Sequence, residues 1–93
     1  MNPVPVQFAG IWERILAERG EFFQTANGRW FTYKLDGDHL ALSQSEIRIP
    51  RSDFELAFNM LPISRSAKLN RLVEGPAYVW AILYDERISQ RDW

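Results

Sequence analysis

The stretch EFFQTANGRWFTYKLDGDHLALS, residues 21–43, decides the fold class of this chain. Asn27-Gly28 and Asp36-Gly37 each separate two runs rich in aromatic and aliphatic residues. Both dipeptides suit a two-residue type I′ turn, because the two central residues of that turn need positive φ angles. The stretch therefore predicts a three-stranded antiparallel β-meander.

Two-residue turns would also set the strand register, pairing Ala26 with Arg29 and Leu35 with Asp38. Paired residues share a face of the sheet, so this register predicts which side chains point inward. The inward face, which we expect to pack on a helix, would carry Phe22, Phe31, Tyr33, Leu40 and Leu42. The outward face would carry Phe23, Thr25, Trp30, Thr32, Lys34, His39, Ala41 and Ser43.

A helix is predicted before the meander, over residues 6–19. Its apolar residues recur at spacings of three and four and would face the sheet: Phe8, Ile11, Trp12, Ile15 and Leu16. Gly20 follows the last of them, where a left-handed residue commonly ends a helix.

After the meander, residues 47–49 are either a short fourth strand or an extended connection. A second helix is predicted from Ser52, which with Glu55 matches a capping box, and it would end before Pro62. Its apolar stripe would be Phe54, Ala57, Phe58 and Leu61. We expect five aromatic side chains to be largely buried: Trp12, Phe31, Tyr33, Phe58 and Trp80.

Two further segments complete the chain. Ser66 is expected to cap a short helix over residues 67–73, with Leu69, Leu72 and Val73 buried. Residues 77–88 contain several strand formers, yet Pro76 suits the first turn of a helix, so both forms stay open and we favour the helix. In either form, apolar residues on all sides indicate a central element.

The predicted order is therefore an N-terminal helix, an antiparallel meander and two to three C-terminal helices. Strands and helices segregate along the chain, which is typical of an α+β fold rather than a wound α/β fold. The 93 residues are the size of one domain, which we expect to span residues 1–93. The content of 46% apolar residues, with four Trp and six Phe, predicts a dense core.

The composition of the chain also indicates the cellular compartment in which we expect the protein. The chain has no cysteine, so a disulfide framework is excluded, and we expect a cytoplasmic protein. The longest apolar run, residues 77–84, is too short to span a bilayer, and the first residues do not resemble a signal peptide. No membrane association is predicted.

Motifs for catalysis are missing from the sequence. The single His, His39, and the lack of Cys exclude the common zinc sites, and nothing beside His39 suggests a catalytic base. The glycines do not have phosphate-loop spacing. We therefore expect no enzyme, no metal, no cofactor and no small-molecule ligand.

Three basic residues, Arg65, Lys68 and Arg71, recur every three positions around the start of the predicted 67–73 helix. A helix start carries partial positive charge, so cations there are unfavourable unless an anion binds. The alternative is that these side chains are simply solvated, and that the helix tolerates the small unfavourable energy of cations at its start.

The outward face of the meander is the second candidate. If nothing covers this face, it would form an aromatic platform of the kind that stacks bases. The platform would consist of Trp30, Phe23, Thr25 and Thr32, edged by Arg29, Lys34 and His39. The alternative is that a chain segment or a second copy covers it, since small domains rarely expose such aromatics together.

Two functions follow from these features. The first is a protein-interaction module that binds another protein or itself, with a homodimer as one form. The second is a nucleic-acid-binding accessory domain, since the net charge of −1 disfavours only a purely electrostatic binder. The second function would use a basic face, an aromatic sheet face at Trp30, or both. It predicts that the following basic residues converge on one face: Arg29, Lys34, Arg48, Arg51, Arg65, Lys68 and Arg71.

Overall fold

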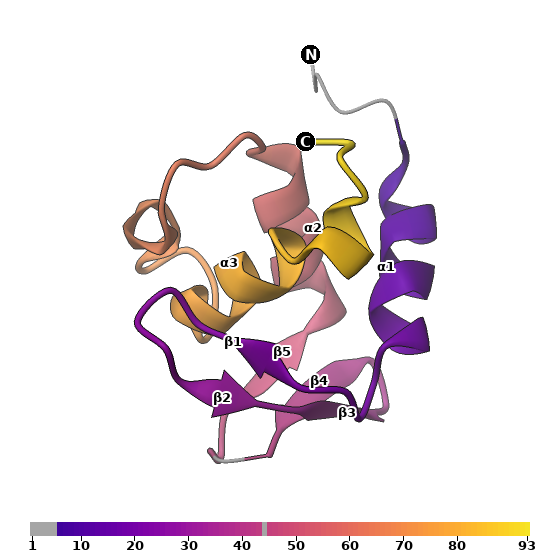
Figure 1. The fold of residues 1–93 in the computed structure, drawn as a ribbon, viewed down its shortest axis with the longest axis vertical. Coiled ribbons are helices and arrows are strands. Elements are labelled where there is room, and N and C mark those ends of the chain that lie inside the picture. Colours follow the sequence, from indigo (N-terminus) through magenta and orange to yellow (C-terminus); the bar gives the residue numbers. More distant parts are fainter. Residues whose placement is uncertain (1–5, 44) are drawn as a thin grey trace.

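The computed structural model describes residues 6–43 and 45–93. Its fold is α+β, as predicted: an N-terminal helix, antiparallel strands and then C-terminal helices (Figure 1). The elements in chain order are α1 (Phe8–Ala17), β1 (Phe23–Gln24), β2 (Trp30–Phe31), β3 (Tyr33–Asp36), β4 (His39–Leu42), β5 (Arg48–Pro50), α2 (Arg51–Asn59), the 3₁₀ turn η1 (Ser66–Leu69), α3 (Pro76–Leu83) and α4 (Glu86–Ser89).

Helix α1 forms where the three-and-four spacing predicted it. Its buried side chains are Phe8, Ile11, Trp12 and Ile15. Gly20 follows with a φ of 86°, and its N–H donates to the carbonyl of Tyr33 at 2.9 Å. The chain therefore passes directly from the end of the helix to the edge of the sheet.

The first hairpin joins β1 to β2 with a register that differs from the predicted one. Phe23 pairs with Phe31, and Gln24 pairs with Trp30. The N–H of Thr25 donates to the carbonyl of Arg29 at 2.9 Å, so the loop holds three residues, 26–28, instead of two. Such loops place a left-handed residue last, and Gly28 has a φ of 90°.

This one-residue shift turns β1 over, because side chains alternate along a strand. Phe22, predicted to face inward, is exposed, whereas Phe23 and Thr25, predicted to face outward, are buried. The Thr25 hydroxyl accepts from the N–H of Arg29 and donates to Asn27 Oδ1, so the buried polar group is satisfied within the loop.

The second hairpin joins β3 to β4, and its register is shifted by two residues. Tyr33 pairs with Leu42 and Leu35 with Leu40, around a turn at Gly37, which has a φ of 64°. A shift of two keeps every side chain on its predicted face. Accordingly, the predicted inward residues Phe31, Tyr33, Leu40 and Leu42 are all buried.

The sheet is divided. β1 and β2 form a two-stranded sheet, and β3, β4 and β5 form a three-stranded one, so the short fourth strand is confirmed. The division lies at Thr32, whose N–H donates to the Ser43 hydroxyl at 2.9 Å while its carbonyl accepts from the Ser43 N–H at 3.0 Å. The predicted continuous meander is therefore interrupted at Thr32, where the Ser43 side chain replaces a backbone partner.

Helix α2 begins one residue earlier than predicted and without the capping box. Pro50 precedes it, and no side chain caps its first turn, so the predicted roles of Ser52 and Glu55 are wrong. Asp53 instead accepts a hydrogen bond from the N–H of Glu74 at 2.8 Å. The predicted apolar stripe is buried: Phe54, Ala57, Phe58 and Leu61.

The predicted helix over residues 67–73 is wrong. Only the short turn η1 forms, Ser66 does not cap it, and Arg71 has a φ of 67°, which no right-handed helix contains. Leu69 is buried as predicted, but Leu72 is exposed.

The segment over residues 77–88, for which we favoured a helix, is helical, but it forms two helices, α3 and α4. Pro76 stands in the first turn of α3, and the Asp85 side chain caps α4 by accepting from the N–H of Arg87. Helix α3 contacts α2, η1, α4 and β1, which confirms the predicted central element (Figure 1). No helix in the described part of the chain is long and apolar enough to cross a membrane.

Candidate interaction surface

The basic residues of the predicted nucleic-acid face have different surroundings. Arg48 pairs with Asp36 at 2.6 Å, and Arg51 lies 3.7 Å from Glu55. The Arg51 guanidinium also lies over the Phe8 ring, 5.0 Å from its centroid. Carboxylates therefore already neutralise two of the predicted contacts.

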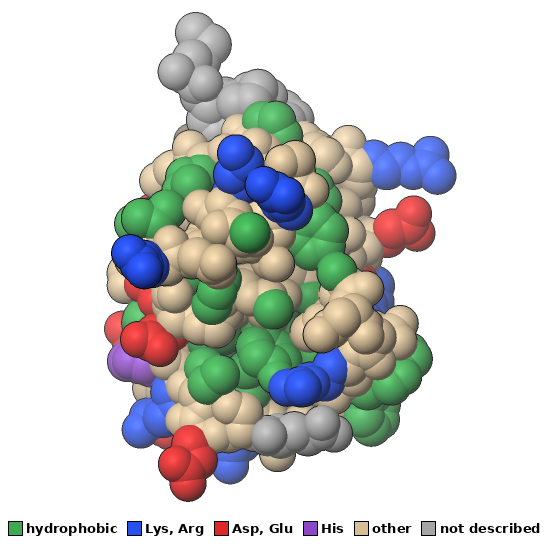
Figure 2. Space-filling model, turned by 90° about the vertical axis from the view of Figure 1, so that its left-hand side faces the viewer, with side chains coloured by type: hydrophobic (Ala, Val, Ile, Leu, Met, Phe, Trp, Pro, Cys, Tyr) green, Lys and Arg blue, Asp and Glu red, His purple; other side chains and the backbone are tan. Residues whose placement is uncertain are grey.

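The other five basic residues, which include Arg71, are exposed. Arg29 donates to the Tyr78 hydroxyl at 3.4 Å, and Lys34 lies on β3. Arg65 and Lys68 lie just before and within η1. The side of the molecule that carries η1 shows Lys and Arg side chains in small groups separated by hydrophobic side chains (Figure 2).

The helix at whose start Arg65, Lys68 and Arg71 were predicted to gather does not form. The three residues do not share a helical face, because η1 ends at Leu69 and the left-handed Arg71 redirects the chain. They are neighbours along one exposed segment, and no anion site follows from their spacing.

The predicted aromatic platform is also different. Phe23 and Thr25 face the core, so Trp30 does not stand beside them on an outer face. The aromatic residues that protrude are Phe22, which is 61% exposed, and Trp30, which is 54% exposed. Both border a hollow that β1 and β2 form with α3 and α4.

Two hollows flank one pair of aromatic rings on α3. The rings of Trp80 and Tyr84 stack with centroids 4.8 Å apart and planes 21° apart. Both residues line both hollows. We call the two hollows and the stacked pair together the Trp80–Tyr84 surface.

The first hollow has a volume of about 510 Å³ and is mainly apolar. Besides the stacked pair it is lined by Met60, Pro62, Ile63, Ser64 and Lys68. Lys68 makes no ion pair with any residue that the structure describes. This hollow therefore offers an apolar pocket with a free cation at its border.

The second hollow has a volume of about 500 Å³ and is more polar. The hairpin contributes Phe22, Phe23, Gln24, Ala26 and Trp30, and the C-terminal helices contribute Ala81, Asp85, Glu86 and Arg87. Glu86 is exposed and has no ion pair within residues 6–43 and 45–93.

Hydrogen bonds to the backbone hold the stacked pair in place. The Tyr84 hydroxyl accepts from the N–H of Ile63 at 2.6 Å, and Trp80 Nε1 donates to the carbonyl of Ile63 at 3.0 Å. Both rings are thus fixed by a single residue of the loop between α2 and η1. A surface held in this way loses little side-chain entropy on binding.

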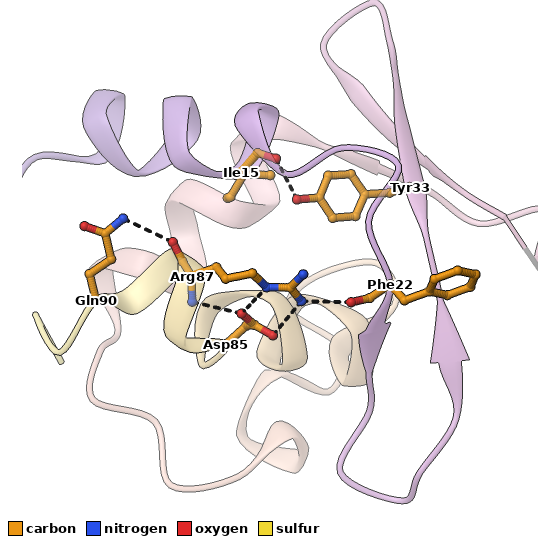
Figure 3. A network of polar contacts seen from close by, with 6 residues as sticks. All are labelled: Ile15, Phe22, Tyr33, Asp85, Arg87 and Gln90. Atoms are coloured by element: carbon orange, nitrogen blue, oxygen red, sulfur yellow. Dashed lines mark hydrogen bonds and ion pairs between the residues drawn. The ribbon is translucent and has the colours of Figure 1, made fainter.

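An ion pair fixes the second hollow (Figure 3). Arg87 Nε and Nη2 donate to the two oxygens of Asp85 at 2.8 and 2.9 Å, and Nη2 also donates to the Phe22 carbonyl at 2.8 Å. The guanidinium lies 4.0 Å from the centroid of the Phe23 ring. Figure 3 shows the Phe22 ring pointing away from this network, toward solvent.

The ion pair changes the titration of both partners. Hydrogen bonds from Arg87 hold the pKa of the Asp85 carboxyl below its usual value, and the same bond raises the pKa of Arg87. Nearby, burial and then the charge of Glu18 raise the pKa of Tyr33, whose hydroxyl donates to the Ile15 carbonyl at 2.6 Å. Asp85, Arg87 and Tyr33 therefore do not change charge near neutral pH. Arg87 links the first hairpin to the C-terminal helices, and Tyr33 links β3 to α1.

The single histidine of the chain is His39. His39 Nδ1 lies 2.7 Å from Asp38 at an exposed turn, away from both hollows. The described residues contain no group of three or more His, Cys, Asp or Glu side chains that could hold a metal ion.

Comparison of the chain with protein-family models, with curated proteins and with solved structures finds no match.

Sequence reasoning named Trp30 and Lys68 but not the surface that they border. Phe22 was missed because the predicted register placed it inside. Trp80 was expected in the core, although it is only half-buried. Its spacing of four from Tyr84 is the signal that could have paired the two rings on one side of a helix.

Proposed function

We propose that this chain is a non-enzymatic protein-interaction module that binds a protein through the Trp80–Tyr84 surface. The observation that carries the proposal is that the exposed Phe22 and Trp30 border one hollow, and that the Trp80–Tyr84 pair joins this hollow to a second, mainly apolar one. Contiguous exposed apolar surface is uncommon on small monomers and typically marks an interaction site.

The chemistry of the surface supports this function. Tyr, Trp, Phe and Met are enriched at protein interfaces, and binding energy concentrates where such residues meet a pocket. The surface has a stacked Trp–Tyr pair at its centre, Met60 on one side and Trp30 on the other. Charged residues, Lys68 and Glu86, stand at its borders, as in the polar rim of an interface.

A photo-cross-linking experiment tests the proposal. A photoreactive phenylalanine analogue replaces Trp30 in one variant and Leu56 in the other, in cells that make the protein. Leu56 is the matched control because it is an exposed apolar residue on α2 that lines neither hollow. We expect protein adducts from position 30 and none from position 56. Absence of protein adducts at position 30, or the same adducts at both positions, would reject the proposal.

We propose nucleic-acid binding as the second candidate, because Trp30 is exposed and Arg29 is the residue beside it. Base stacking on an exposed aromatic residue is worth about 1–3 kcal/mol per base. Labelled single- and double-stranded oligonucleotides are titrated at low and high salt against wild type, Trp30→Ala and Lys68→Ala/Arg71→Ala. Single-strand binding that Trp30→Ala weakens about tenfold or more would support this candidate. No binding by wild type at low salt would remove it.

A further inference from the structure

Resting on the proposed function, we propose that the partner of the Trp80–Tyr84 surface is the same surface of a second copy of this chain, in a two-fold dimer. In this dimer the protruding hairpin aromatics of each copy enter the apolar hollow of the other. Lys68 of each copy then meets Glu86 of the other.

A two-fold interface must be complementary to itself: where one residue contacts a second, the second contacts the first in the other copy. A surface suits this symmetry when its two halves differ and fit each other. The Trp80–Tyr84 pair borders both hollows and therefore marks the boundary between two such halves.

The halves are complementary in shape. One half presents Phe22 and Trp30, each more than half exposed. The other half is the apolar hollow of about 510 Å³ formed by Met60, Pro62 and Ile63. An aromatic side chain buries about 150–250 Å² on full insertion, so two equivalent insertions would make the apolar centre of an interface.

The halves are also complementary in charge. Lys68 borders the apolar half, Glu86 borders the hairpin half, and neither has an ion-pair partner among the described residues. The nearby Asp85 and Arg87 already neutralise each other. Rotation about a two-fold axis at the stacked pair exchanges the halves, so two Lys68–Glu86 pairs form at once.

A second copy uses this surface more fully than an acidic peptide would. A carboxylate-rich peptide would be attracted at Lys68 and repelled at Glu86, because like charges brought together at an interface are unfavourable. A second copy pairs both charges and fills the apolar hollow of each copy.

Analytical ultracentrifugation of charge-reversal variants tests the dimer. Wild type is compared with Lys68→Glu, Glu86→Lys and the double variant, over a concentration series at low salt. We expect each single reversal to raise the dimer dissociation constant about tenfold or more, since it sets like charges opposite each other twice. The double variant restores both pairs with inverted sign and should return to within about threefold of wild type.

Matched controls separate interface charge from overall charge. Lys34→Glu and Glu13→Lys make the same changes in net charge at exposed positions on β3 and α1 that line neither hollow. They should leave the dissociation constant within about twofold. Trp30→Ala should raise it about thirtyfold, as expected for a central aromatic anchor. Unchanged circular dichroism spectra, and unchanged melting temperatures at a concentration low enough to keep wild type monomeric, would show that each variant folds.

Each result decides the proposal. Wild type that stays monomeric at about millimolar concentration, far above the micromolar range of specific dimers, would overturn it. A double variant as weak as the single ones would overturn it as well, because both charges would then act separately. In either case, cross-links from position 30 to another protein would leave the proposed function standing, whereas their absence would remove it too.

Discussion

The two hairpins of this protein have similar turn sequences, yet the structure departs from the predicted register by one residue in the first and by two in the second. The first departure exchanges the faces of β1, so Phe23 is buried and Phe22 is exposed. The second leaves Tyr33 and Leu42 on the predicted inward face. An even shift is harmless to a burial pattern and an odd shift inverts it, because side chains alternate with a period of two.

The two hairpins are also anchored differently. The first has short strands, and the Arg87 side chain holds it by its hydrogen bond to the Phe22 carbonyl and its contact with the Phe23 ring. The second pairs with β5 and is tied to α1 by the neutral bond from Tyr33 to Ile15. The first hairpin thus depends on charge, and the second depends mainly on strand pairing.

The largest expected effect separates the two registers directly. Phe23→Ala should lower the free energy of unfolding by about 3–5 kcal/mol, because the ring is buried and its removal leaves a cavity. Phe22→Ala, the matched control, should change the free energy of unfolding of the monomer by less than about 0.5 kcal/mol, as exposed positions usually do. Urea denaturation at a protein concentration that keeps wild type monomeric measures both. A larger loss for Phe22→Ala would mean that β1 has the register of a two-residue turn.

The glycines at the turns provide the next test. Gly28→Ala and Gly37→Ala should each cost about 1–2 kcal/mol, because φ angles of 90° and 64° are unfavourable for a residue with a Cβ. Gly10→Ala is the matched control: it lies within α1 with open space around it and should stabilise by about 0.5–1 kcal/mol. Thermal unfolding of the three variants checks this. No loss at either turn would contradict the assigned turn positions.

Acid should loosen the first hairpin before the second. The pKa of Asp85 is lower folded than unfolded, so its ion pair contributes stability above the unfolded pKa, and that stability is lost as pH falls through the folded value. Asp85→Ala should cost about 1 kcal/mol at neutral pH through loss of the helix cap and the ion pair, and the difference from wild type should shrink at acidic pH. Hydrogen exchange of β1 and β3 amides across this range measures it. Equal loosening of both hairpins would reject the charge dependence.

The smallest expected effect lies where the two hairpins meet. Ser43→Ala removes the hydroxyl that accepts from the Thr32 N–H, at a site that solvent reaches. The loss should be about 0.5–1 kcal/mol, the usual net value of one hydrogen bond. Ser64→Ala, at an exposed residue of the first hollow, is the control. A loss above about 2 kcal/mol would mean that the break between the sheets is more central to stability than this single bond indicates.

Local patterns sufficed for most elements and failed where several local solutions compete. The spacing in α1 and the stripe of α2 predicted burial correctly, since an amphipathic helix has one face to bury. The Asn27-Gly28 sequence favours a two-residue turn, yet Gly28 also suits the left-handed last position of the three-residue loop that forms. The stretch from Ser66 to Val73 had a cap signal and apolar residues at helical spacing, yet it forms only one 3₁₀ turn.

The candidate surface could be predicted only in pieces. Trp30 and Lys68 were identified as candidates from their residue types, but they come from different elements and border different hollows. Met60, Pro62 and Ile63 carry no motif. Their part in the surface depends on the loop after α2 lying against Trp80 and Tyr84, an arrangement of residues about twenty positions apart.

Residue order and polarity alone were enough for the class of this fold: a helix, antiparallel hairpins, then helices around an apolar α3. Those features depend on the spacing of apolar residues, with a period of 3.6 in helices and 2 in strands, and on the turn residues. All of these are local properties of the sequence. The packed molecule decided the face of β1, the break at Thr32 and the joining of two hollows at Trp80 and Tyr84. Each of these depends on contacts between distant segments, whose free energies exceed the small differences between local conformations.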